Sequence, residues 1–386
     1  MRILYYNQGF AEDGGLGTHA VGLLRGFEEI GHEVCAIPAP PTCLADDPPR
    51  AKRALRLPEI VKTPLREARG LTRASLLQGA TVRTAMHFDP ELCIVRRFSH
   101  DYVLPRLERT VGCPVIAECN SIQVFETRDY WSQHLTPWER RSECAFLRRA
   151  DLCVAVSAEI AEQLAAVGVR PERVEVIQNG VDLRLFPLEG EVDGGVADWR
   201  RPFSVVIGYC ATVSAIHDLD TVVAAATAVS ELFPDTGFLF VGPTTADLVG
   251  AGMNAGLAKN RCLATGRIQH AKVASVLRAA DIFWAATHHP YGSLLKLYEY
   301  LALGRPIVLA AEGSGVLPVV DACAGAVVPR QDAAALAREA RLRIADGTLR
   351  REEGESGRRW VEQHGTWAVT ASRTIDAAVA RGLLAR

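Results

Sequence analysis

A basic and an acidic side chain stand one helical turn apart in the stretch 293–310, which reads SLLKLYEYLALGRPIVLA. Lys296 and Glu299 share one face of the short helix that this stretch predicts, since residues three apart are neighbours on a helix surface. Gly304 ends the helix, and an apolar strand begins at Ile307. An ammonium and a carboxylate just ahead of a buried parallel strand are typical of a polar-ligand site in α/β proteins. Two interpretations of the Lys296 side chain stay open: it pairs with Glu299, or it reaches the phosphates of a ligand.

Glycines follow the first apolar strand, in the segment Gly14–His19. At a strand-to-helix turn, Gly15 and Gly17 let backbone N–H groups approach a phosphate at the positive end of a helix. The spacing also matches a dinucleotide-binding fingerprint, but that alternative needs an acidic residue at the end of the second strand, which here closes in Ala36-Ile-Pro-Ala. A purely structural glycine turn is the third interpretation.

The bulk composition excludes several classes of protein. The chain has 386 residues, which suggests two domains, and a net charge of −2, which provides no global field for nucleic acid. Its ten cysteines show no C-x-x-C or zinc spacing and predict buried thiols in a reducing cytoplasm. The N-terminus reads as a strand rather than a signal peptide, and no apolar run approaches the ~20 residues of a membrane span. We therefore expect a cytoplasmic protein whose membrane contact, if any, is peripheral to the inner membrane.

Strands and helices alternate twice along the chain, which predicts an α/β protein with two doubly wound parallel sheets. We expect a first domain over 1–187, a second over 203–364, and a terminal helical segment over 365–386. The segment 187–202 carries Pro, Gly and Asp without apolar periodicity and is interpreted as an interdomain linker.

Residues 50–83 hold nine Lys or Arg against two Glu. Two interpretations stay open: helices with solvated basic faces, or a surface that binds an anionic partner.

Several motifs occur in an order that resembles the family 4 retaining glycosyltransferases, which have the GT-B fold. They are Gly14–His19, Val174–Phe186, Phe240-Val-Gly-Pro, Thr265-Gly-Arg-Ile, Ala280-Asp-Ile, the stretch 293–310, and Trp367 at the start of the last helix. The resemblance spans nearly the whole chain. It implies two Rossmann-like domains facing a cleft, with the C-terminal helix crossing back to the first domain.

The resemblance also implies a nucleotide-sugar donor site. Glu299 would hold the ribose hydroxyls, and Gly17, beside Gly15, would contact the diphosphate. The nucleobase would lie near Arg267 and Ile268. Backbone N–H groups around Tyr291, Ser293, Leu294 and Leu295 would contact the sugar.

This chain departs from the common family pattern at two places. Tyr291 stands where many members have a second Glu, and Thr212 and His217 stand where an Arg and a Lys usually bind the diphosphate. The leaving diphosphate needs about two charges stabilised in the transition state. The candidates are Lys296, Arg267 and His217, and we predict His217, Lys296 and Tyr291 as the catalytic residues.

For the acceptor, Glu118 and Asn120 lie at the end of a strand in the first domain and resemble a family variant, while His19 stands beside the glycine loop. Ordinary strand-end polar residues remain the alternative interpretation. We predict no metal and no other cofactor, since the nucleotide sugar is a co-substrate and His288 and His289 have no acidic ligand spaced with them.

The resemblance implies a retaining transfer of a sugar, with UDP favoured, to a carbohydrate, lipid-linked or natural-product acceptor. High Ala and Arg usage suggests a GC-rich bacterial genome, hence a role in bacterial glycan or natural-product biosynthesis. Two alternatives remain. One is a sugar-nucleotide 2-epimerase, for which only Glu118, Asp89 and the histidines offer acid/base groups. The other is a non-catalytic relative or partner subunit, to which the two departures point.

Overall fold

The computed structural model describes residues 1–11, 15–38, 59–129, 135–288 and 293–385. The chain divides into two compact units. Unit 1 comprises Met1–Gln178 and Thr370–Arg386, and unit 2 comprises Asn179–Val369. Each contains a six-stranded sheet whose paired strands are parallel, which confirms the expected α/β class with two doubly wound sheets. The domain boundaries expected from the sequence stay predictions.

The sheet of unit 1 has the order β2-β1-β3-β4-β5-β6. Its strands are β1 (Arg2–Asn7), β2 (Glu33–Ile37), β3 (Leu92–Arg96), β4 (Val115–Cys119), β5 (Leu152–Ala155) and β6 (Val174–Val176). Strands β3, β4 and β5 are buried along their whole length and are mostly apolar in sequence, apart from Arg96 in β3 and Glu118 in β4. The chain reverses direction across the sheet between β1 and β3, and at such a switch point the carboxyl ends of the strands form a binding crevice.

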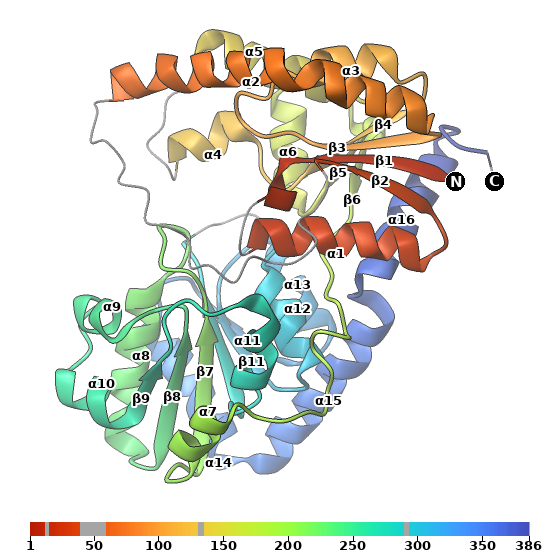
Figure 1. Cartoon of the computed structure of the whole chain (residues 1–386). Helices are drawn as coiled ribbons and strands as arrows, with labels where there is room; N and C mark the ends of the chain where they lie inside the picture. The colour runs from red at the N-terminus through yellow and green to blue at the C-terminus, as the bar shows by residue number, and fades with distance from the viewer. Residues whose placement is uncertain (12–14, 39–58, 130–134, 289–292, 386) are drawn as a thin grey trace. The chain divides into compact units, whose positions relative to one another are not determined.

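The helices of unit 1 cover both faces of this sheet, with α1 on one side and α2 on the other (Figure 1). They are α1 (Gly15–Glu29), α2 (Glu59–Phe88), α3 (Leu104–Thr110), α4 (Gln123–Asp129), α5 (Pro137–Arg149) and α6 (Ala158–Ala166), with α16 (Trp367–Ala380) returning from unit 2. Short 3₁₀ turns lie at Gln8–Ala11 and Pro171–Arg173.

Helix α16 covers the open edge of the sheet at β6. The hydroxyl of Thr370 donates to the carbonyl of Gln178 at 3.2 Å, and Arg381 Nη2 donates to the carbonyl of Val174 at 3.1 Å and to Glu175 Oε2 at 2.9 Å. Because an edge strand carries unpaired backbone groups, these contacts satisfy acceptors that would otherwise be left to solvent or to another chain.

The sheet of unit 2 has the order β12-β11-β10-β7-β8-β9. Its strands are β7 (Val205–Cys210), β8 (Thr236–Val241), β9 (Cys262–Ala264), β10 (Ile282–Ala286), β11 (Ile307–Ala310) and β12 (Gly325–Val328). This is the strand order of a dinucleotide-binding Rossmann sheet, and its switch point lies between β7 and β10. The backbone is tightly packed at this end: Gly242 has φ +108°, and a Cβ there would lie 2.0 Å from the carbonyl oxygen of Ala211.

Helices pack on this sheet from both of its faces. They are α7 (Gly194–Arg200), α8 (Leu219–Leu232), α9 (Thr245–Gly250), α10 (Ala255–Arg261), α11 (His270–Leu277), α12 (Leu295–Ala302), α13 (Leu317–Asp321), α14 (Ala333–Ala345) and α15 (Gly347–His364). The segment 187–202, which we expected to be an interdomain linker, contains helix α7 and belongs to unit 2. Asp193 caps α7 by accepting from Val196 N–H at 3.3 Å, Val196 is buried in the core of unit 2, and Arg200 pairs with Asp281 at 2.7 Å.

None of the helices in the described ranges is long and apolar enough to cross a membrane.

Candidate donor and acceptor sites

Hydrogen bonds hold the loop after β7 against the carboxyl end of β10. His217 and Thr287 form an antiparallel bridge, and the carbonyl of Ile216 accepts from both the Thr287 hydroxyl and the His288 N–H at 2.9 Å. Asp218 then caps α8 by accepting from Thr221 N–H at 3.0 Å. These contacts fix the backbone of His217 beside the switch point of the sheet.

Lys296 and His217 meet at this place, although they are 79 positions apart in the chain. Lys296 Nζ lies 3.3 Å from His217 Nδ1 and 5.5 Å from the centre of the Tyr209 ring. Burial lowers the pKa of the Lys296 ammonium to about 8. When Lys296 is charged, its ammonium can only donate, so the acceptor in this contact is Nδ1 of His217. The roles of His217 and Lys296 in binding the diphosphate stay predictions.

Glu299 lies one turn further along α12 and contacts a different residue. Its Oε1 is 2.9 Å from Nε2 of His270, the first residue of α11, and the two side chains are 11% and 22% exposed. The ring of Phe186 packs against that of His270, with centroids 5.5 Å apart. Burial alone would lower the pKa of His270, but the hydrogen bond and charge of Glu299 outweigh it and raise the pKa. The carboxylate is thus held in a fixed orientation.

The start of α12 is anchored from the first segment of unit 2. Asn179 Nδ2 donates to the carbonyl of Ser293 at 2.9 Å, and Ser293 Oγ lies 3.3 Å from the hydroxyl of Tyr298. Leu294, the N-cap residue, has no side-chain capping bond and packs its side chain on the core of unit 2. The first N–H groups of α12 are therefore not capped by the side chain of Leu294, which suits an anionic ligand.

The other predicted donor residues lie in the same unit. Thr212 and Arg267 are exposed, Leu295 is half-buried, and Ile268 packs on the core. Tyr291 lies outside the described residues. The structure thus brings Lys296 and His217 together, while the donor roles of all these residues stay predictions.

In unit 1, Glu118 is the centre of a buried polar cluster at the switch point. Its Oε1 lies 2.6 Å from His19 Nε2 and 3.7 Å from Arg96 Nη1, and its Oε2 accepts from the Tyr5 hydroxyl at 2.6 Å. Asn120 Nδ2 lies 3.1 Å from His19 Nδ1. Burial by itself raises the pKa of Glu118, but the charges of His19 and Arg96 and the hydrogen bonds it accepts lower it overall. The three residues predicted to bind the sugar acceptor are therefore linked by contacts. Glu118 is ionised, and its carboxylate oxygens already contact neighbouring side chains.

The glycine motif begins α1, because this helix starts at Gly15 and His19 lies within its second turn. Gly17 is buried. The backbone N–H groups of Gly15 and Gly17 therefore belong to the first turn of a helix of 15 residues, where the macrodipole favours an anion.

Sequence reasoning missed three residues of these clusters. His270 stands two residues after the Thr265-Gly-Arg-Ile motif, which follows strand β9, and this position is the sequence signal that could have found it. Tyr5 and Arg96 lie in strands whose sequence predicts core residues. Only the tertiary structure shows that their polar atoms lie close to Glu118.

The described residues hold no group of three or more His, Cys, Asp or Glu side chains arranged to bind a metal ion. Metal independence stays a prediction.

Two Rossmann-like units, each built on a six-stranded parallel sheet, define a two-domain α/β protein of the GT-B class. The model of Glycosyltransferase Family 4 matches residues 13–185, and that of Glycosyl transferases group 1 matches residues 204–346. The chain belongs to the family 4 glycosyltransferases and has the GT-B fold.

Individual relatives agree with this assignment. A D-inositol 3-phosphate glycosyltransferase of Kribbella flavida is 25% identical over 239 residues, which is 59% of this chain and 56% of that protein. The match thus spans little more than half of that relative. Among solved structures, sucrose-phosphate synthase of Thermosynechococcus elongatus has a TM-score of 0.69 at 19% identity, covering 99% of both chains. HepE of Anabaena, solved with UDP-glucose, has a TM-score of 0.70 at 17% identity, covering 98% of this chain and 100% of that one.

Proposed function

We propose that this glycosyltransferase transfers a sugar from a UDP-sugar donor to an acceptor hydroxyl with retention at the anomeric carbon, releasing UDP. The observation that carries the donor assignment is the Glu299 carboxylate, which is nearly buried and oriented by His270 at 2.9 Å. A carboxylate in such a place requires donors, and the vicinal hydroxyls of a ribose supply two. The Anabaena relative solved with UDP-glucose supports UDP as the nucleotide.

In the proposed reaction, the bond from the anomeric carbon to the diphosphate oxygen breaks, and a bond to the acceptor oxygen forms on the same face. The acceptor proton passes to the leaving phosphate oxygen, so no side-chain base is required. Lys296 donates to the departing diphosphate, and His217 donates through Nε2–H; both stabilise charge that develops as the bond breaks. Because burial holds the pKa of Lys296 near 8, the approach of a diphosphate raises it and keeps the ammonium charged.

For the acceptor, the proposal keeps His19, Glu118 and Asn120 of unit 1. Their mutual contacts support a pre-organised polar cluster at the switch point rather than isolated strand-end residues. A bacterial glycan or natural product is the proposed acceptor class, and the reaction is proposed to proceed without a metal, through the helix ends and Lys296.

Titration calorimetry with UDP and GDP tests the donor site. We expect wild-type protein to bind UDP and Glu299→Gln to bind it about tenfold or more weakly, which is about 1.4 kcal/mol. Lys272→Ala is a matched control, because Lys272 is exposed on α11, the helix that carries His270. Equal UDP binding by Glu299→Gln would exclude the ribose role.

Turnover is tested separately with UDP-glucose, measuring UDP release with and without a metal chelator and the anomeric configuration of the product by NMR. Retention and chelator resistance are expected. An inverted product would refute the mechanism. UDP binding without UDP release across a panel of acceptors would indicate the non-catalytic alternative, which the exposed Thr212 in place of a cation favours.

A further inference from the structure

Helix α2 of unit 1 has two unlike faces. One face is buried, and it is so close to its neighbours that a Cβ on Gly70 would lie 2.5 Å from the carbonyl oxygen of His100. The opposite side carries a row of residues that we name the outer face of α2. It consists of Leu65, Ala68, Arg69, Thr72, Arg73, Leu76 and Leu77, which line one shallow hollow along the helix.

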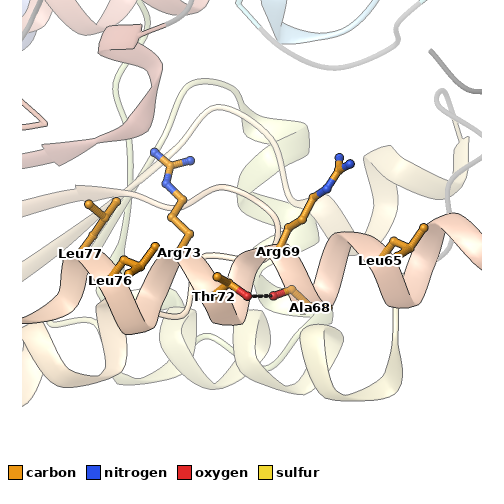
Figure 2. Close-up of a pocket in the computed structure, with 7 residues that line it drawn as sticks. All are labelled: Leu65, Ala68, Arg69, Thr72, Arg73, Leu76 and Leu77. Atoms are coloured by element: carbon orange, nitrogen blue, oxygen red, sulfur yellow. Dashed lines mark hydrogen bonds between the residues drawn. The ribbon is translucent and has the colours of Figure 1, made fainter. Parts of the chain in front are cut away.

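Large apolar side chains are exposed on this face. Leu76 is 76% exposed, Leu65 is 45% and Leu77 is 44%. Figure 2 shows Leu65 at one end of the row and Leu76 and Leu77 at the other, with the two arginines between them. Single exposed leucines such as Leu232 are ordinary, but a set aligned on one helix face marks an interaction surface.

The charged residues of the outer face of α2 are all basic. Arg69 and Arg73 are exposed and one turn apart, and none of the seven residues is acidic. The acidic Glu67 belongs to the other side, where it accepts from the hydroxyl of Thr136 at 3.1 Å. The face therefore combines cationic heads with apolar side chains along a helix of 30 residues, which is about 45 Å long.

We propose that the outer face of α2 binds the surface of an anionic lipid bilayer, with the helix lying in the interface plane. Leucines enter the acyl boundary and arginines contact lipid phosphates, which is the arrangement of interfacial helices. A nucleic acid would use the arginines but not the leucines. A protein groove would use the leucines, but it would not need charges of one sign between them. The proposal is independent of the donor site.

The structure sets the size of the expected effect. Each arginine near an anionic surface contributes about fivefold in partitioning, so the two together contribute about thirtyfold at low salt. Two leucines that move from water to the acyl boundary contribute at least about tenfold. Binding should weaken as salt rises, because the arginine part is screened.

Flotation of the full chain with vesicles tests the proposal, using phosphatidylcholine alone and phosphatidylcholine with one third phosphatidylglycerol. The variants are Leu65→Gln/Leu76→Gln and Arg69→Gln/Arg73→Gln. The control is Leu232→Gln, which removes an exposed leucine of unit 2. Thermal melts and UDP binding establish that each variant is folded.

We expect wild type and the Leu232 control to float with the anionic vesicles only, and both α2 variants to lose at least tenfold in binding. Failure of wild type to float at low salt overturns the proposal, as does equal flotation of all variants. Loss in the arginine variant alone also overturns it, since that outcome is adsorption without insertion. A changed oligomeric state of the leucine variant in sedimentation, without vesicle binding by wild type, would assign the face to a protein partner instead.

Discussion

The pair formed by His270 and Glu299 gives the sharpest prediction about the donor site. His270→Ala removes the donor at 2.9 Å from Glu299 Oε1 and leaves the carboxylate with water in place of an oriented partner. If Glu299 binds the ribose, the loss must appear as weaker nucleotide binding that depends on the ribose hydroxyls.

The magnitude follows from the kind of bond and its exposure. A hydrogen bond to a charged group contributes about 1.5–3 kcal/mol, and the lower end applies here because His270 retains 22% exposure of its side chain. We therefore expect UDP to bind about tenfold more weakly to His270→Ala. His270→Gln, whose amide nitrogen can also donate to the carboxylate, should recover part of the affinity.

The assay is calorimetry with UDP and with its 2′,3′-dideoxy analogue. Wild type and His270→Ala should bind the dideoxy analogue equally, since it offers no hydroxyl to Glu299. Lys272→Ala should match wild type with both nucleotides. Equal or tighter binding of UDP by His270→Ala would show that His270 competes with the ribose for the carboxylate, and would refute the positioning role.

Three further predictions concern pH and packing. The raised pKa of His270 means that its pairing stabilises the fold fully below its ordinary value of 6.5 and is lost as pH rises through the folded-state pKa. Urea unfolding should therefore show the wild type's advantage over His270→Gln at pH 6 and a smaller one at pH 9. Lys296→Met should raise the unfolding free energy at pH 7 by up to about 3 kcal/mol, because the pKa of Lys296 falls from 10.5 to about 8. That gain in unfolding free energy should shrink between pH 8 and 10.5, because in this range the unfolded wild type binds more protons than the folded wild type. A gain that does not change with pH would contradict the lowered pKa of Lys296. Gly242→Ala should destabilise by well over the ~1 kcal/mol of a left-handed backbone, since its Cβ meets the Ala211 carbonyl, whereas Gly252→Ala has φ +95° and no atom within 4 Å. Equal melting temperatures of these two variants would contradict the packing argument.

The elements that could be predicted are those whose sequence pattern is local. Strands such as β3 and β4 are buried along their whole length and consist mostly of apolar residues. Strand β9 has three residues and β12 has four, with mixed burial, so neither has enough length to show a pattern. Helix α7 was missed because its signal is the cap at Asp193 and not periodicity.

The candidate site divides in the same way. The partners of Glu118 could be approached from topology, because carboxyl ends of parallel strands meet at a switch point. The contact of Glu299 with His270 spans 29 positions and depends on how α11 and α12 pack, which no local spacing encodes. The contact of His217 with Lys296 at 3.3 Å likewise spans 79 positions, and only the tertiary structure supplies it.

The return of α16 to unit 1 has a consequence for the order of folding on the ribosome. The strands of unit 1 are complete at residue 178, yet the helix that covers β6 begins to join this unit only at Thr370. At about 5–20 residues per second, the intervening 191 residues (179 to 369) take roughly 10–40 s to synthesise. During that interval the β6 edge lacks the contacts that Arg381 and Thr370 provide. The nascent first unit is therefore the stage at which this chain is most exposed to strand-edge aggregation and most in need of a chaperone.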